Sequence, residues 1–190
     1  MKTQVKHGSS KIMKLGHKKN NDTMHLKERG ADMIQVGLYA IAALIVMILA
    51  FMLYTQFTSA NKTKEHITNI KMLNAGVYNL FHQQGLRNYT SITTASVAKT
   101  NATPEGFKDG NAITNEWSGN ITLGAAGNSF TITDKAIPLK ECIDIILGSY
   151  TDFASVKVGA KTITKATAAT APSDAILGCA SATNTIIYTH

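Results

Sequence analysis

Two cysteines, Cys142 and Cys179, are the first side chains in this sequence that could do chemistry. Neither has a second cysteine two to four residues away, which is the spacing that zinc fingers and ribbons use. The six histidines form no pairs three or four residues apart, with each other or with the cysteines, so we expect no metal site. If this part of the chain is exported to an oxidising compartment, the even number of thiols favours one disulfide over two buried free thiols.

The motifs of common catalytic sites are absent from the sequence. It contains no Gly-x-Ser-x-Gly elbow, phosphate-binding loop or dinucleotide fingerprint. We expect no enzymatic activity and no cofactor. Carboxylates are sparse in the second half of the chain, and we expect them on the surface or between subunits; they are Glu105, Asp109, Glu116, Asp134, Glu141, Asp144, Asp152 and Asp174.

The net charge of +7 is concentrated at the N-terminus. Residues 1–30 contain seven lysines and one arginine against Asp22 and Glu28, so this segment alone carries +6 of the charge. A protein that binds nucleic acid would carry its basic residues on a folded face, with aromatic side chains among them. The rest of the chain is almost neutral, and we expect no direct binding of nucleic acid.

A membrane helix is indicated by the segment that follows the basic residues. No charged residue lies between Met33 and Asn61, and Val36–Tyr54 is apolar on every face. About 20 such residues span the hydrocarbon core of a bilayer, whereas a buried helix of a soluble protein is seldom apolar all round. The positive-inside rule places the basic segment in the cytoplasm and everything after about Thr58 outside.

The helix is expected to continue beyond the membrane with one apolar stripe. Between Asn61 and Gly85 the apolar residues recur at spacings of three and four, and lysines and polar residues separate them. We predict one helix from about Asp32 to Gln84, weakened locally at Gly76 and stopped by Gly85. The stripe consists of Ile67, Ile70, Leu73, Val77, Leu80 and Phe81.

The remainder of the chain has the pattern of a small α+β domain. Short alternations of apolar and polar residues predict strands near 120–123, 130–133, 155–158 and 185–188, and helices are expected at 138–147 and 173–177. We interpret the segments 88–104 and 159–172, which are rich in Thr, Ala and Ser, as surface loops. The sheet should pack on the apolar stripe of the long helix, giving an α+β fold.

Several short motifs, taken in order, resemble those of type IV prepilins. Lys27–Gly30 followed by Ala31–Gln35 and the apolar run is similar to the site where a prepilin peptidase cuts after glycine. Asn115–Ile121 resembles the Asn-x-Trp/Phe-Gly-Gly segment of type IVb pilins, whose two cysteine segments resemble Ile137–Cys142 and Gly178–Ala180. The basic leader is long, as in the type IVb class.

The resemblance implies a pilin fold with three parts. These are a cytoplasmic leader (1–30), a long helix (31–85, divided into a transmembrane or filament-core part at 31–57 and an amphipathic part at 58–85) and a globular head (86–190). Cleavage between Gly30 and Ala31, methylation of Ala31 and a Cys142–Cys179 disulfide that bounds a C-terminal loop are implied. The implied partners are prepilin peptidase, the pilus assembly machinery and further copies of the chain in a helical homopolymer. The protein would lie in the bacterial inner membrane and then in an extracellular pilus that supports adhesion, aggregation or conjugation.

One position departs from the family pattern. The fifth residue after the implied cleavage is usually glutamate, whose carboxylate meets the N-terminal amine of a neighbouring subunit, but this chain has Gln35. An amide accepts a hydrogen bond from the amine and cannot neutralise its charge. Either Asp32 supplies the charge, or the subunit assembles differently. A minor pilin, a pseudopilin of a secretion system and a membrane-anchored binding module therefore stay as alternatives.

Overall fold

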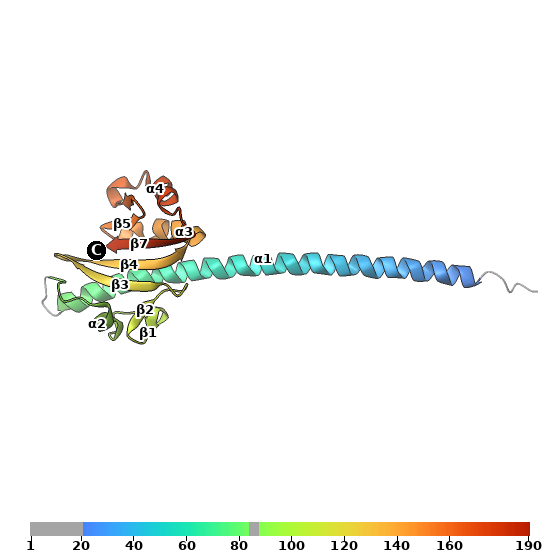
Figure 1. The fold of residues 1–190 in the computed structure, drawn as a ribbon, viewed down its shortest axis with the longest axis horizontal. Coiled ribbons are helices and arrows are strands. Elements are labelled where there is room, and N and C mark those ends of the chain that lie inside the picture. Colours follow the sequence, from blue (N-terminus) through green and yellow to red (C-terminus); the bar gives the residue numbers. More distant parts are fainter. Residues whose placement is uncertain (1–20, 84–87) are drawn as a thin grey trace, which may run out of the picture. The chain divides into compact units, whose positions relative to one another are not determined.

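The structure is a computed structural model that describes residues 21–83 and 88–190, with side chains for 33–82 and 88–190. The chain divides into two units, Met1–Leu53 and Tyr54–His190. Helix α1 (Asn21–Gln83) runs through the boundary (Figure 1). It begins earlier than the start that the sequence predicted near Asp32. The predicted stop at Gly85 lies outside the described residues.

The second unit contains a seven-stranded sheet in which all neighbours are antiparallel, in the order β1-β2-β3-β4-β7-β5-β6. The C-terminal strand β7 lies between β4 and β5, so the end of the chain is in the middle of the sheet. The strands are β1 (Lys108–Asp109), β2 (Ala112–Thr114), β3 (Asn120–Ala126), β4 (Ser129–Pro138), β5 (Ser155–Val158), β6 (Lys161–Ile163) and β7 (Thr183–Thr189).

Short helices precede the first strand and connect several of the later ones. Figure 1 shows α2 with β1 and β2 on one side of the C-terminal part of α1, and α3, α4 and β5 on the other. Pro138 ends β4 and is the N-cap residue of α3, directly before the first helical residue, Leu139. The helices are α2 (Thr94–Ala98), α3 (Leu139–Ser149) and α4 (Ala171–Gly178), with the 3-10 turns η1 (Glu105–Phe107), η2 (Tyr150–Asp152) and η3 (Lys165–Thr167).

The apolar stripe of α1 forms one wall of the core, as the sequence predicted. Ile70, Leu73 and Val77 are completely buried, and Ile67 and Leu80 are partly buried against the same cluster. The inner faces of the strands and of α3 form the other wall, which includes Phe130, Ile132, Ile145, Ile186 and Tyr188. The predicted α+β fold, a long helix packed on a small antiparallel sheet, is confirmed.

The structure differs from the sequence prediction in the two segments interpreted as surface loops. The first contains α2 and buries Tyr89, Ile92 and Val97, and the second contains β6 and η3. Gly76 also has a packing role, because a Cβ at this position would overlap the backbone of Ala102. The helix therefore continues through Gly76, and its missing side chain allows the 88–104 segment to approach closely.

Candidate functional site

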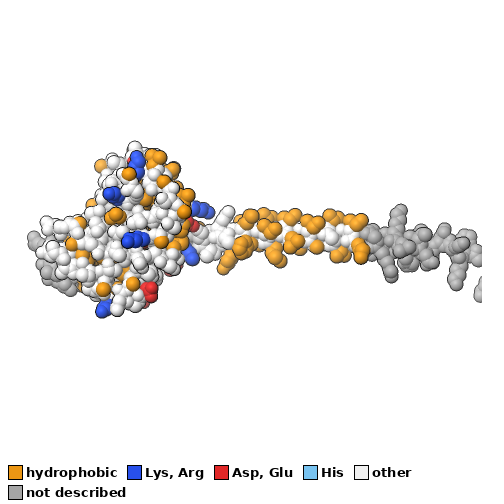
Figure 2. Space-filling model, in the orientation of Figure 1, with side chains coloured by type: hydrophobic (Ala, Val, Ile, Leu, Met, Phe, Trp, Pro, Cys, Tyr) orange, Lys and Arg blue, Asp and Glu red, His pale blue; other side chains and the backbone are white. Residues whose placement is uncertain are grey.

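The apolar part of α1 is exposed on all sides within a single chain. Its large side chains are more than half exposed from Met33 (80 %) to Phe57 (69 %). Figure 2 shows hydrophobic side chains along the face of this segment that is in view. Within the described part of the chain, the one helix long and apolar enough to cross a membrane is Met33–His82, near the N-terminus. This surface needs cover from lipid or from other helices.

The residues predicted for processing and for the filament core lie at the start of this segment. The backbone at Gly30, Ala31 and Asp32 belongs to α1, but their side chains are outside the described residues. The Nε2 of Gln35 donates a hydrogen bond to the hydroxyl of Tyr39 one turn later, at 3.1 Å. Gln35 is thus held along the helix surface within its own chain.

Cys142 and Cys179 form a disulfide in the structure. Their Cα atoms are 6.0 Å apart, and both residues are buried. The bond joins α3 to the residue that caps α4, and it encloses β5, β6 and η3 between them. No cluster of three or more His, Cys, Asp or Glu residues that could hold a metal occurs among the described residues.

A tight turn between β2 and β3 is organised by the side chain of Asn115. Its Oδ1 accepts hydrogen bonds from the backbone N–H of Trp117 (3.0 Å) and Gly119 (2.7 Å). Its Nδ2 donates to Asp134 Oδ1 (2.8 Å) and to the Lys135 carbonyl (2.7 Å), both on β4. Ser118 has a φ of 62°, a left-handed conformation that favours glycine, and a Cβ at Gly119 would overlap the Lys135 carbonyl.

Sequence reasoning missed a buried ionic network centred on His66 of α1. The expectation that Glu116 and Asp134 lie on the surface or between subunits is wrong, because both carboxylates pair with His66 inside the domain. The Nδ1 of His66 lies 2.6 Å from Glu116 Oε2, and its Nε2 lies 2.8 Å from Asp134 Oδ2, off the line of an ideal hydrogen bond. Asn69 Nδ2 donates to the other oxygen of Glu116 at 3.1 Å. We call these residues, with Asn115, the His66 network. It connects α1, the β2–β3 turn and β4.

The charge of His66 is favoured in this environment. Burial lowers the pKa of His66, but the hydrogen bonds and negative charges of Asp134 and Glu116 outweigh burial and raise the pKa to about 9. The imidazole is therefore protonated at neutral pH and compensates two carboxylates. Its ring also contacts Phe107 and Trp117, with centroid distances of 5.4 and 5.1 Å. One sequence signal could have revealed this network: polar Thr63, His66 and Asn69 recur at a spacing of three next to the apolar stripe.

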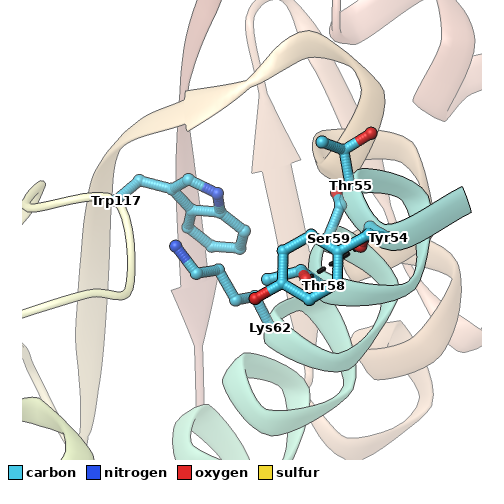
Figure 3. A pocket seen from close by; sticks show the side chains of 6 residues that line it. All are labelled: Tyr54, Thr55, Thr58, Ser59, Lys62 and Trp117. Atoms are coloured by element: carbon cyan, nitrogen blue, oxygen red, sulfur yellow. Dashed lines mark hydrogen bonds between the residues drawn. The ribbon is translucent and has the colours of Figure 1, made fainter. Parts of the chain in front are cut away.

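A pocket opens beside α1, directly after the apolar run. It is lined by Trp117 from the β2–β3 turn and by residues from three turns of α1 (Figure 3). Nearby, the hydroxyl of Ser59 donates to the carboxylate of Glu141 and so joins α1 to the first turn of α3. The lining residues are Tyr54, Thr55, Thr58, Ser59, Lys62 and Trp117.

Comparison with protein families gives one match. A family model described as PilS N terminal matches residues 60–190, which is more than half of the chain. The matched segment includes the amphipathic part of α1, the His66 network, the Asn115 turn and both cysteines. No curated protein matches the sequence.

Proposed function

Because this chain belongs to the PilS family of type IV pilin-related proteins, we propose that it is a structural subunit of a type IV pilus. The proteins of this family are structural. We assign the subunit to the type IVb class because its basic leader is long. In this proposal prepilin peptidase removes residues 1–30, Ala31 becomes a methylated N-terminus, and the assembly machinery polymerises the subunit. The pilus would then support adhesion, aggregation or conjugation.

The observation that carries the proposal is the contrast between two parts of one helix. From Met33 to Phe57 the large apolar side chains are exposed, whereas Ile70, Leu73 and Val77 are completely covered by the chain's own sheet. A single subunit thus buries the apolar stripe of the second part but leaves the apolar side chains of the first part uncovered. Lipid can cover the first part before assembly, and the same helices of neighbouring subunits can cover it in a filament.

A charge placed in the middle of the exposed part tests this proposal. Leu44→Lys should still reach the membrane, because the run around it is long, although the lysine costs roughly 2.5–3.5 kcal/mol on insertion scales. It should abolish fibres, because a tightly packed apolar core offers the ammonium no partner. Leu44→Ile is the matched control and should assemble normally. Electron microscopy of the fraction sheared from cells gives the result, and fibres from Leu44→Lys in normal amounts would contradict the proposal.

The same experiment distinguishes a pilus subunit from the alternative function, a membrane-anchored binding module. In that case wild-type cells would contain the chain in the membrane, and neither wild type nor Leu44→Ile would give fibres. A minor pilin or pseudopilin would be incorporated into fibres only together with another, more abundant subunit. Fibres formed by this chain as their main component support the pilus subunit.

A further inference from the structure

The pocket beside Trp117 has no role in the proposed assembly through the apolar run. Its cavity volume is about 260 Å³, enough for a small polar group. Figure 3 shows the Lys62 side chain extending toward the Trp117 ring, with the Tyr54 ring on the same part of α1. The position of Trp117 is fixed from behind, because its backbone N–H is held by Asn115 and its ring lies against the buried His66.

The free polar groups of this pocket suit an anion. Thr58 donates its hydroxyl proton to the Tyr54 carbonyl, and Ser59 donates its own to Glu141, so both protons are used. Among the described residues, no hydrogen bond or ion pair engages the Lys62 ammonium or the Trp117 indole N–H. Glu141, whose carboxylate accepts the Ser59 proton, is not among the lining residues. An ammonium and an indole N–H beside two aromatic rings fit an anionic group that carries apolar substituents.

The position of the pocket along α1 indicates which kind of anion it would meet. Tyr54 is the last residue of the apolar run, and the helical rise places Lys62 about 12 Å further along the helix axis. The headgroup layer of a bilayer extends roughly 5–8 Å beyond the hydrocarbon core, within reach of a lysine side chain from this position. Tryptophan and tyrosine are enriched at this level of membrane proteins. The pocket therefore lies where phospholipid phosphates lie if Val36–Tyr54 spans the membrane.

We propose that this pocket binds the phosphate of a phospholipid headgroup in the leaflet that faces the head, before the subunit enters a filament. Lys62 contacts the phosphate, and Trp117 and Tyr54 lie at headgroup level on either side of it. The His66 network is the positioning device that holds Trp117 in the pocket. This inference rests on the membrane stage of the proposed function, and it adds a defined contact between the head and the lipid surface.

The sequence offers a direct probe, because Trp117 is its single tryptophan. The full chain is reconstituted in phosphatidylcholine vesicles with or without phosphatidylglycerol, containing a nitroxide lipid labelled either at the headgroup or in the middle of the acyl chain. Both leaflets carry the label, so the orientation of the protein does not affect the measurement. We expect the headgroup label to quench Trp117 several-fold more strongly than the mid-chain label.

Two lysine variants test the charge. Lys62→Gln should weaken the preference for phosphatidylglycerol, measured by Trp117 emission, by about fivefold, as expected for the loss of one solvent-accessible ion pair with the phosphate. Lys64→Gln is the matched control, since Lys64 is exposed on a different face of the same turn, and it should behave as wild type. Equal effects of the two variants would show a diffuse attraction to the surface and would overturn the site.

Other outcomes identify a different occupant. If inorganic phosphate alone changes the emission of the detergent-solubilised protein in a Lys62-dependent way, the site binds soluble anions and the lipid proposal is wrong. If emission depends on the ratio of protein to lipid and not on the labels, a second copy occupies the pocket and the proposal is also wrong. Vesicle flotation distinguishes failure of the proposed function from failure of this site. A chain that does not float with the vesicles contradicts the membrane stage of the proposed function. A chain that floats but whose Trp117 is not quenched contradicts the phosphate site alone.

Discussion

The imidazole of His66 on α1 and the carboxylate of Glu116 in the β2–β3 turn lie 2.6 Å apart inside the folded domain. With Asp134 on the opposite ring nitrogen, they form a buried group of three charges between the helix and the sheet. Breaking such a network by removing one charge is costly, because the remaining charges stay buried without compensation. The protonation of His66 should therefore be coupled to the stability of the whole domain.

The stability of the domain should depend on pH through His66. Its pKa is about 9 in the folded chain, against 6.5 for an unperturbed histidine side chain, which represents the unfolded chain. A group whose pKa is raised by folding adds stability that is fully present below the unfolded pKa and is lost as the pH rises through the folded pKa. The stability that His66 contributes should therefore be complete at about pH 6.5 and decline from there to pH 9 by up to about 3 kcal/mol, and the melting temperature should fall over this range.

Two histidine variants check the assignment of this pH dependence. His66→Gln should lose about 3–5 kcal/mol of stability and show a flat profile over the same pH range. His82→Gln, at an exposed residue stacked on Tyr78, should keep the wild-type profile. A decline between pH 6.5 and 9 that persists in His66→Gln would contradict the assignment.

The turn that presents Trp117 should not tolerate a side chain at Gly119. Gly119→Ala places a Cβ against the Lys135 carbonyl and should lower the free energy of unfolding by about 3 kcal/mol or more. Ser118→Gly should keep or raise the stability, because Ser118 already has a φ of 62°. Gly37→Ala, where no atom lies within 4 Å of the added Cβ, is the matched control. Denaturant unfolding of the three variants measures the order of their stabilities. A Gly119→Ala variant as stable as the wild type would refute this geometry.

The fold could be predicted well from local patterns, and the candidate site only in part. The stripe from Ile67 to Phe81 and the strand alternations depend on residues close in the sequence, so periodicity reveals them. The partner Glu116 lies 50 residues from His66, and only the register of β2 and β3 brings it there. The 88–104 segment has few apolar residues, so its composition predicted a surface loop. Those residues, such as Tyr89 and Val97, are nevertheless buried, because the segment packs closely against the C-terminal part of α1.

The disulfide should contribute measurably to the stability of the head. Its cysteines are 37 residues apart, and the chain-entropy relation gives a stabilisation of about 3–4 kcal/mol for a loop of this size. Thiol labelling of the denatured, unreduced protein should find no reactive cysteine. The double variant Cys142→Ser with Cys179→Ser should unfold at lower denaturant concentration, and two labelled thiols in the denatured, unreduced protein would refute the disulfide.

Asp32 should supply the negative charge that Gln35 lacks. After cleavage before Ala31, the new N-terminal amine is positive and enters an apolar core, where it needs a carboxylate. Asp32→Asn should therefore reduce the amount of sheared fibre strongly, and Gln35→Glu in the same chain should restore it. Gln35→Glu alone should assemble as well as wild type or better. Unchanged fibre yield from Asp32→Asn would show that this carboxylate is not the partner of the amine.

The mass of the subunit taken from purified fibres tests the central claim most directly. Cells that express the full chain with a prepilin peptidase are sheared, the fibres are isolated, and intact-mass and N-terminal analysis are made without reduction. We predict fibres built from this chain, with methylated Ala31 as the first residue and with the two cysteines joined. A chain that keeps Met1 and stays in the membrane as a monomer, with no fibre in the sheared fraction, would contradict the account.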